Sequence, residues 1–372
     1  MKIEDIQNLY RHDFGSFIQC AFGILNPHVQ FQDNWHIQLM ANYLKQVSDG
    51  KIKRLIINMP PRMLKSECVS VAWPAWELGR NPHKKILCLH ASNALGRDLD
   101  EACFELMASR RYRSLFPSTI IKSEANRLMT SFKGRRQFMP IMGRLTGLGS
   151  DIIIIDDPMS STEARNMHER QSLNDQFDDN ILQRLNDKTN GAIVLVMQRL
   201  HEEDLTSHLL AKDEGWVHLN LPAIAVQDEI WELPYGQKYQ RAKGEALHEA
   251  RESREQLLGI LKALGGYPFS YQYLQGAYKP HFGEEGYGSI WLTPQREGVF
   301  WDARTSPQRP FGFYDLKEED LILPKVFNIG YDPHPPDMRD GLSPEELKIG
   351  LAQYREVMME HQRKVASGEL DY

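Results

Sequence analysis

The stretch RLIINMPPRMLKSECVSVAWPAWELG, residues 54–79, contains an apolar run, a turn and a segment with helical character in immediate succession. The run at residues 54–59 is short and rich in isoleucine, which is typical of a buried parallel strand. Pro60 and Pro61 end this strand because proline lacks the N–H that a sheet requires. A helix is predicted over residues 66–78, so the stretch has the strand–loop–helix order of a phosphate-binding loop.

The loop has the length and the ending of the P-loop pattern G-x-x-x-x-G-K-[ST], but it has neither glycine. Lys65 is expected at the exposed start of the helix, within reach of nucleotide phosphates, and Ser66 is expected to bind Mg²⁺. The free N–H groups of the helix start favour an anion. Leu64 replaces a glycine, so the backbone there must avoid positive φ or tolerate strain. The predicted nucleotide-binding residues of the loop are Pro60, Pro61, Arg62, Met63, Leu64, Lys65 and Ser66. The alternative interpretation is a surface turn followed by an ordinary helix start.

Four isoleucines at residues 152–155 lead directly into Asp156, Asp157 and Pro158. A carboxylate at the carboxyl end of a buried parallel strand faces the ligand crevice of an α/β sheet. In P-loop enzymes this is the Walker B position, so Asp156 is predicted to hold Mg²⁺. Asp157 is predicted to orient the attacking water, and Glu163 competes for that role. A plain Asp-Asp-Pro turn is the alternative. Together with the loop, this motif predicts ATP hydrolysis.

Strands and helices alternate through the first 226 residues. This pattern predicts an α/β fold with a three-layer P-loop NTPase core and a mostly parallel sheet, followed by a smaller irregular C-terminal region. Besides the elements above, the predictions are helical structure over 3–50, strands at 85–90, 151–156 and 192–197, helices at 94–109 and 161–186, and a hairpin at 128–139.

The predicted domains are an ATPase motor (1–226), a helical lid or linker (227–282) and a short C-terminal region (283–372). Residues 227–266 are polar and are predicted to be helical, and the chain beyond Pro268 is predicted to be rich in loops. Residues 343–372 begin with Ser-Pro-Glu-Glu, a helix-start pattern, and are predicted to form one amphipathic helix.

The composition, with 41% hydrophobic and 25% charged residues, indicates a globular protein. The net charge of -6 means that any contact with DNA must come from a local basic patch. The four cysteines form no C-x-x-C pair or zinc pattern, so we expect buried thiols in a reducing compartment. No apolar run reaches the about 20 residues that span a bilayer, and the N-terminus does not resemble a signal peptide.

These motifs resemble the large subunits of phage and prophage terminases, in the subgroup that carries Pro-Pro-Arg-x-Leu-Lys-Ser. Residues 54–79 look like the ATPase motif of that family. The resemblance extends over residues 13–280, roughly three quarters of the chain. The other similar stretches are FQDNWHIQLMANYL (31–44), GRLTGLGSDIIIIDDP (143–158), RLNDKTNGAIVLVMQRLHEEDLTSHLL (184–210), LNLPAIA (219–225) and FSYQYLQGAYKP (269–280).

The resemblance implies an ATPase motor that uses ATP and Mg²⁺ to drive double-stranded viral DNA into a procapsid. Arg62 and Lys65 would contact phosphates, and Ser66 and Asp156 the metal. Many relatives have glutamate after the Walker B aspartate, so Asp157, one methylene shorter, is a departure from the family pattern.

The resemblance also places Trp35, His36 and Gln38 near the adenine. A histidine packed within a helix is the alternative for His36.

Gln198 and Arg199 would belong to the motif that couples hydrolysis to DNA movement. Alternatively, Arg199 pairs with Glu202 or Glu203.

The implied partners are double-stranded DNA, the portal protein and the terminase small subunit, with a homo-oligomeric ring assembled on the portal in the cytoplasm of the bacterial host and no membrane. In such rings one subunit inserts an arginine into its neighbour's site, which accelerates phosphoryl transfer. Arg144 is the candidate, and Arg135 and Arg136 are alternatives. Ordinary solvated charges are the other interpretation of exposed arginines.

A terminase large subunit also carries a nuclease domain, whose carboxylates hold two metals about 3.5–4 Å apart. Beyond Pro280, Asp332 ends one possible strand, with Asp337 and Asp340 close by, but prolines interrupt any sheet there. We therefore expect the nuclease to be absent, truncated or replaced, and we interpret these aspartates as an acidic turn. Two other functions stay open: a P-loop helicase or translocase of different purpose, and a prophage remnant that acts only as an interaction protein.

We predict that the purified chain does not cut DNA in Mg²⁺ or Mn²⁺, because a two-metal nuclease needs carboxylates from several strands. A plasmid-nicking assay measures this. Nicking that disappears in Asp332→Ala, but persists in Asp156→Ala, would show that a compact nuclease site exists.

Overall fold

The computed structural model describes residues 3–276, except positions 118, 120, 125 and 213, together with residues 281–282, 287–289 and 300–302. Its centre is an eight-stranded sheet in the order β3-β4-β5-β2-β6-β7-β1-β8. The pairings from β5 through β8 are parallel, and β3 and β4 add an antiparallel edge. The strands are β1 (Arg54–Asn58), β2 (Lys85–His90), β3 (Ile121–Glu124), β4 (Arg127–Thr130), β5 (Arg135–Pro140), β6 (Ile152–Asp156), β7 (Ala192–Met197) and β8 (Val217–Asn220). The predicted mostly parallel sheet is confirmed.

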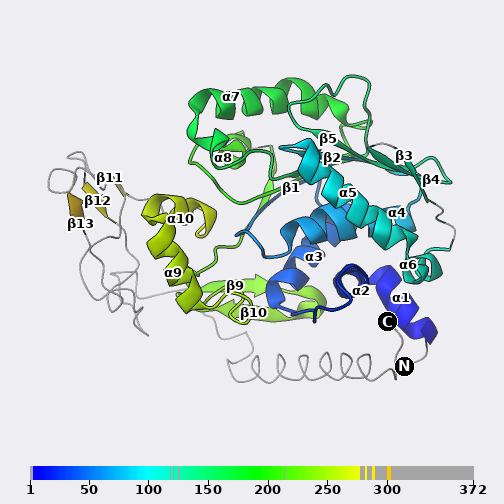
Figure 1. Ribbon diagram of the computed structural model, residues 1–372, viewed down its shortest axis with the longest axis horizontal. Helices are drawn as coiled ribbons and strands as arrows, with labels where there is room; N and C mark the ends of the chain where they lie inside the picture. The colour runs from blue at the N-terminus through cyan, green and yellow to red at the C-terminus, as the bar shows by residue number, and fades with distance from the viewer. Residues whose placement is uncertain are drawn as a thin grey trace.

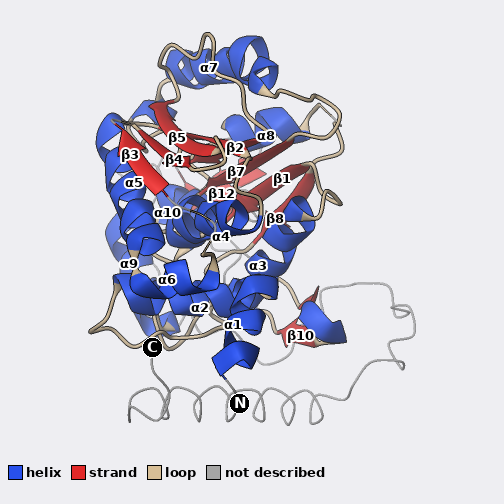
Figure 2. Cartoon of the chain, turned by 90° about the vertical axis from the view of Figure 1, so that its right-hand side faces the viewer, coloured by secondary structure: helices blue, strands red, loops and turns tan. Residues whose placement is uncertain are grey.

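Helices cover both faces of this sheet (Figures 1 and 2). On one face lie the helices that precede β5, and on the other lie α7 and α8. The first group is α1 (Ile3–His12), α2 (Phe14–Leu25), α3 (Trp35–Ser48), the π-helix η1 (Glu67–Ala72), α4 (Trp73–Arg80), α5 (Asn93–Ala108) and α6 (Arg110–Leu115). The second group is η2 (Glu163–Arg165), α7 (Met167–Gln176), η3 (Phe177–Ile181), η4 (Leu182–Arg184) and α8 (Leu205–Leu210).

The alternation of side chains along the central strands produces two separate cores. Successive strand residues point to opposite faces, and both faces of these strands are apolar. Ile57, Ile154 and Val196 join the core under α2, α3 and η1. Ile56, Ile155 and Leu195 join the core under α7 and α8. The continuous isoleucine run of β6 thus serves both cores, and the three-layer fold class expected from the sequence is confirmed.

The long helix predicted over residues 161–186 is wrong. The chain instead forms a 3₁₀ turn, the helix α7, and then the π and 3₁₀ turns η3 and η4. Asn166 has extended backbone and its side chain accepts a hydrogen bond from the N–H of His168, so it caps α7 and prevents a continuous helix through residue 166.

The helical prediction for residues 227–266 is correct only for its last part. Residues 229–241 form an antiparallel hairpin of β9 (Glu229–Glu232) and β10 (Lys238–Arg241), joined through the 3₁₀ turn η5 (Pro234–Gly236). The hairpin gains a tertiary partner, because Tyr239 stacks on Trp35 with ring centroids 4.5 Å apart. The helix α9 (Arg254–Leu264) begins with a capping box between Ser253 and Gln256.

A small third core lies after β8. The apolar side chains that form it are Ala223, Ile224, Ala246, Leu257, Leu261, Phe269 and Leu274. It joins α9 to α10 (Gly266–Gln272), a helix within the region predicted to be loop-rich. A further antiparallel sheet contains β11 (His281–Phe282), β12 (Tyr287–Ser289) and β13 (Phe300–Asp302). The domain boundaries at residues 226 and 282 stay predictions.

Other expectations concern the ends of the chain. The predicted N-terminal helical region is confirmed as α1, α2 and α3, with residues 26–34 outside these helices. Asp332, Asp337, Asp340 and the helix predicted over 343–372 lie outside the described residues. None of the helices in the described part is long and apolar enough to cross a membrane. All four cysteines are buried free thiols, which confirms the burial expected of Cys68 and Cys88 from their apolar surroundings in the sequence.

Arg136, one of the alternative trans-acting arginines, is a structural residue. Its side chain is fully buried, forms an ion pair with Asp100 of α5 and donates hydrogen bonds of 3.2 and 3.0 Å to the carbonyl of Ser70 in η1. It therefore cannot reach a neighbouring molecule. Arg135 is partly buried and donates to the carbonyl of Gly149, whereas Arg144 is exposed.

We predict that Arg136→Ala lowers the free energy of unfolding by about 3–5 kcal/mol, because it leaves the carboxylate of Asp100 buried without a partner. Arg144→Ala, at an exposed position, should change it by less than about 0.5 kcal/mol. Denaturant unfolding of both variants measures the difference. Equal, small effects would contradict the structural role of Arg136.

Candidate active site

The loop between β1 and η1 has two residues with left-handed backbone. Arg62 and Leu64 both have φ of 63°. Leu64 thus occupies the backbone conformation that a glycine ordinarily supplies, at a cost of about 1–2 kcal/mol. From the sequence, the backbone at Leu64 either avoids positive φ or tolerates strain, and the structure has the strained, positive-φ conformation.

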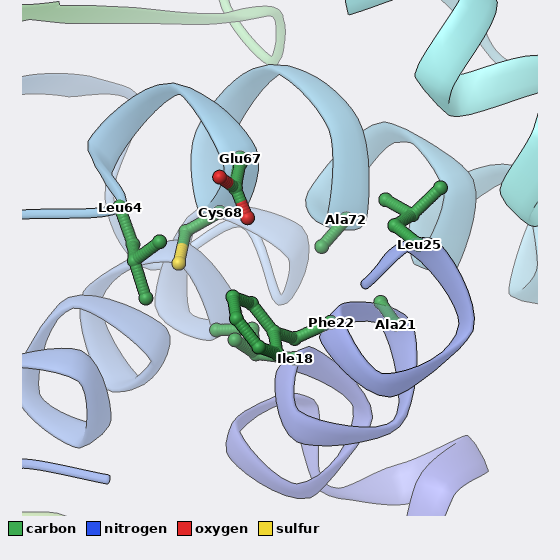
Figure 3. Close-up of a pocket in the computed structure, with 8 residues that line it drawn as sticks. All are labelled: Ile18, Ala21, Phe22, Leu25, Leu64, Glu67, Cys68 and Ala72. Atoms are coloured by element: carbon green, nitrogen blue, oxygen red, sulfur yellow. The ribbon is translucent and has the colours of Figure 1, made fainter. Parts of the chain in front are cut away.

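The side chain of Leu64 packs into a mostly apolar pocket beneath the loop. The pocket lies between α2 and η1, with Leu64 and Cys68 on one side and Ile18 and Phe22 on the other (Figure 3). Its free volume is only about 10 Å³, at the lower limit for one water molecule. Leu64 is 8% exposed and is part of the core that includes α2. Burial of this side chain offsets the backbone strain and fixes the shape of the loop.

Lys65 points to the carboxyl end of β6, which is separated from β1 by β7 in the sheet. Its ammonium nitrogen lies 2.7 Å from Oδ2 of Asp157, and its side chain is only 8% exposed. The expectation that Lys65 lies at an exposed helix start is therefore wrong. The ion pair with Asp157 holds the lysine side chain against the end of β6.

Asp156 connects the same loop to the sheet. The hydroxyl of Ser66 donates to Oδ1 of Asp156 at 3.0 Å, and the hydroxyl of Ser70 donates to Oδ2 at 2.6 Å. Asp156 is fully buried, so burial and then the charge of Asp157 raise the pKa of its carboxyl, while Lys65 and the serine hydroxyls oppose the rise. A buried carboxylate of this kind favours a cation beside it.

The oxygens of Ser66 and Asp156 fit one edge of a magnesium site. Adjacent ligands of an octahedral Mg²⁺ at about 2.0–2.1 Å lie about 3 Å apart, which matches the 3.0 Å between these two oxygens. Magnesium in such sites needs only one or two protein ligands beside substrate phosphates and water. No cluster of three or more His, Cys, Asp or Glu side chains that could hold a metal occurs in the described part of the chain.

Asp157 and Glu163 occupy different surroundings. Asp157 has φ of 41°, and its Oδ1 accepts a hydrogen bond of 3.3 Å from the backbone N–H of Gln198. Glu163 is exposed, and its Oε2 accepts a hydrogen bond of 2.7 Å from the N–H of Ser160. This carboxylate therefore stabilises the local turn at residues 160–163. Hydrogen bonding to Ser160 lowers the pKa of Glu163. Of the two, Asp157 is the carboxylate next to Lys65.

The segment after β7 links Asp157 to α10. Arg199 is buried and pairs with Asp204 at 2.8 Å, not with Glu202 or Glu203. Its backbone N–H donates to Oε1 of Gln275 at 2.9 Å. The chain from Asp157 through Gln198 and Arg199 to Gln275 is thus joined by hydrogen bonds and one peptide bond.

The segment predicted to lie near adenine is mostly buried. Trp35 is covered by Tyr239, and His36 is fully buried with its ring 5.5 Å from that of His248. Burial lowers the pKa of His36 to about 3. Gln38 donates to Asp33 at 3.3 Å. None of the three lines the cleft described next.

A cleft of about 740 Å³ lies directly beside the loop between β1 and η1. This volume is within the range of small-molecule and cofactor sites. Arg62 and Met63 form its P-loop side, Gln30 and Gln32 come from the segment before α3, and α9 with the residues before it forms the opposite wall. A Cβ added to Gly259 of α9 would meet nothing within 4 Å, which leaves that wall open.

Three residues of the site were missed in the sequence. Ser70 lies four residues after Ser66, a spacing that places both hydroxyls on one helix face and could have signalled its role. Gln30 precedes α3, and Gln275 lies beyond α10; nothing in their local pattern marks them, because their positions depend on tertiary packing.

No protein-family model matches this chain, and no curated protein matches it. Among solved structures, it is similar to the large terminase of bacteriophage HK97 with 14% identity and a TM-score of 0.42, covering 56% of this chain and 44% of that one. It is also similar to the large terminase ATPase domain of Thermus phage P74-26, with 13% identity and a TM-score of 0.40, covering 68% and 95%. A third is the large terminase of a thermophilic bacteriophage in complex with ADP, with 11% identity, a TM-score of 0.39 and coverage of 77% and 69%. The chain therefore spans less than half the length of the HK97 protein.

We predict that Leu64→Ala destabilises the protein by about 2–5 kcal/mol, because it removes buried apolar surface but keeps the left-handed strain. Leu64→Gly loses one further methyl group but relieves about 1–2 kcal/mol of left-handed strain, so it should be the more stable of the two variants. Chemical denaturation orders the variants. A glycine variant less stable than the alanine variant would contradict the strained conformation at residue 64.

Proposed function

We propose that this chain is an ATPase motor of the terminase type, which couples ATP hydrolysis to the movement of double-stranded viral DNA into a procapsid. The observation that carries the proposal is the 2.7 Å contact between Lys65 and Asp157, beside the hydrogen bond from the half-buried Ser66 to the buried Asp156. A lysine, a hydroxyl and two carboxylates at the carboxyl edge of a parallel sheet are the groups that nucleotide hydrolysis requires. The sequence resemblance to terminases supports the assignment to DNA packaging.

Arg62, Lys65 and the N–H groups at the start of η1 would bind the phosphates of ATP. In the described structure Lys65 is held by Asp157. We infer that the triphosphate draws the lysine away from this partner, because three phosphate groups carry more negative charge than one carboxylate. The same movement leaves Asp157 without its cation.

Mg²⁺, held by Ser66 and Asp156, would neutralise charge on the phosphates during transfer. Asp157 would then accept a hydrogen bond from the attacking water and orient it toward the γ-phosphate. Glu163 is the alternative for this role, but it lies exposed and bonded to Ser160.

We infer that Gln198 and Arg199 transmit the state of the site. A change in the position of Asp157 acts on the N–H of Gln198, and the neighbouring Arg199 holds Gln275 beyond α10. The proposed partners are double-stranded DNA, a portal protein and a small subunit, with a ring of copies in the bacterial cytoplasm. The exposed Arg144 is the candidate that enters the neighbour's site in that ring.

The test is ATP turnover with and without double-stranded DNA. We predict that Asp157→Asn lowers kcat at least about 100-fold while ATP binding changes little, because the carboxylate acts on water and not on the nucleotide. Glu163→Gln should retain most of the activity. Lys65→Ala should abolish turnover and weaken ATP binding.

The outcomes separate the candidate functions. Wild-type turnover in Lys65→Ala would exclude the P-loop assignment, and a loss in Glu163→Gln without one in Asp157→Asn would make Glu163 the catalytic carboxylate. Stimulation by single-stranded but not double-stranded DNA favours a helicase. A chain that binds portal protein but never hydrolyses ATP would be an interaction protein.

A further inference from the structure

The cleft beside the P-loop has one wall that the sheet domain does not supply. Arg251 and Glu252 line it from the segment that leads into α9, and Gln256 lines it from α9 itself. Of the predicted nucleotide-binding residues, Arg62 and Met63 line the same cleft. A ligand that fills it must therefore contact residues from both sides.

Glu252 is the unusual group on the far wall. Its carboxylate oxygen Oε2 is buried and has no hydrogen-bond partner among the residues that the structure describes. An unpaired buried oxygen of this kind is destabilising, more so when charged, unless a ligand satisfies it. Burial raises the pKa of Glu252, and the charges of Arg251 and Arg62 oppose the rise.

The backbone around Glu252 is fixed to the sheet domain. The side chain of Asn34, the N-cap of α3, donates a hydrogen bond of 2.6 Å to the carbonyl of Leu247. His248 packs against the buried His36, and its carbonyl accepts the N–H of Glu252 at 2.9 Å. These contacts fix the backbone that carries Glu252 against α3, which supports a recognition residue from behind.

We propose that Glu252 recognises the ribose of the bound nucleotide by accepting hydrogen bonds from its 2′- and 3′-hydroxyls, and so makes the site specific for ribonucleotides. This inference rests on the proposed ATPase function. The ribose follows directly after the α-phosphate, so a carboxylate across the cleft from Arg62 is placed for it. An acidic side chain has the same task in dinucleotide-binding folds, because a carboxylate is an acceptor without a donor.

The experiment compares the binding of ADP and 2′-deoxy-ADP to the full chain in Mg²⁺ by calorimetry, which does not depend on hydrolysis. We expect the wild type to bind ADP about tenfold more tightly, the effect of one hydrogen bond to a charged acceptor. Glu252→Ala should bring the two affinities to within about twofold. Glu255→Ala is the matched control, since Glu255 is exposed in the first turn of α9 and does not line the cleft.

The possible failures are distinguishable. Equal binding of both nucleotides by the wild type, or an unchanged preference in a folded Glu252→Ala, overturns the ribose assignment and leaves the ATPase proposal intact; Glu252 would then serve only as a counter-charge to Arg62. A wild type that binds neither nucleotide overturns both proposals. Thermal unfolding of each variant shows that the comparison is made on folded protein.

Discussion

The buried carboxylate of Asp156 joins the P-loop to the centre of the sheet, and the geometry of the site depends on it. It accepts hydrogen bonds from the hydroxyls of Ser66, which precedes η1, and of Ser70 within η1. Arg136 holds the carbonyl of the same Ser70 from the other side. The helix start that presents Lys65 is thus fixed at two places, at Ser66 by Asp156 and at Ser70 by both Asp156 and Arg136. Loss of the Asp156 carboxylate would release the end of the loop.

The order of the strands explains why residues far apart in sequence meet here. β1 and β6 each flank β7, and all three run parallel. Their carboxyl ends therefore lie at one edge, which brings Lys65, Asp157 and Gln198 together. The segment that follows β7 also contacts the chain beyond α10, through the hydrogen bond between the N–H of Arg199 and the side chain of Gln275.

Much of the site could be predicted because its signals are local. A strand, a proline-containing loop and a Lys-Ser pair lie within thirteen residues. The run of four isoleucines predicts a second buried strand, with Asp156 at its end. The failures have a different origin. Polar composition suggested helix at residues 229–241, but the stacking of Tyr239 on Trp35 decides for a hairpin. Lys65 is buried and paired with Asp157 of a distant strand end, and Asn166 interrupts a helix by capping the turn that follows it. Tertiary contacts overrode propensity in the first two cases, and a local cap did so in the third.

The anchoring of Leu64 has a consequence for how a ligand would be received. A glycine-rich loop samples many shapes when empty, and ordering it on binding has an entropic cost. Here the loop is held from beneath by α2, so that ordering has already occurred when the chain folds. The left-handed backbone strain at Leu64 is the energetic cost of holding the loop in this one conformation. The loop should accordingly keep one conformation with and without a ligand. Conformational changes on binding should be concentrated in the side chain of Lys65 and in the wall formed by α9.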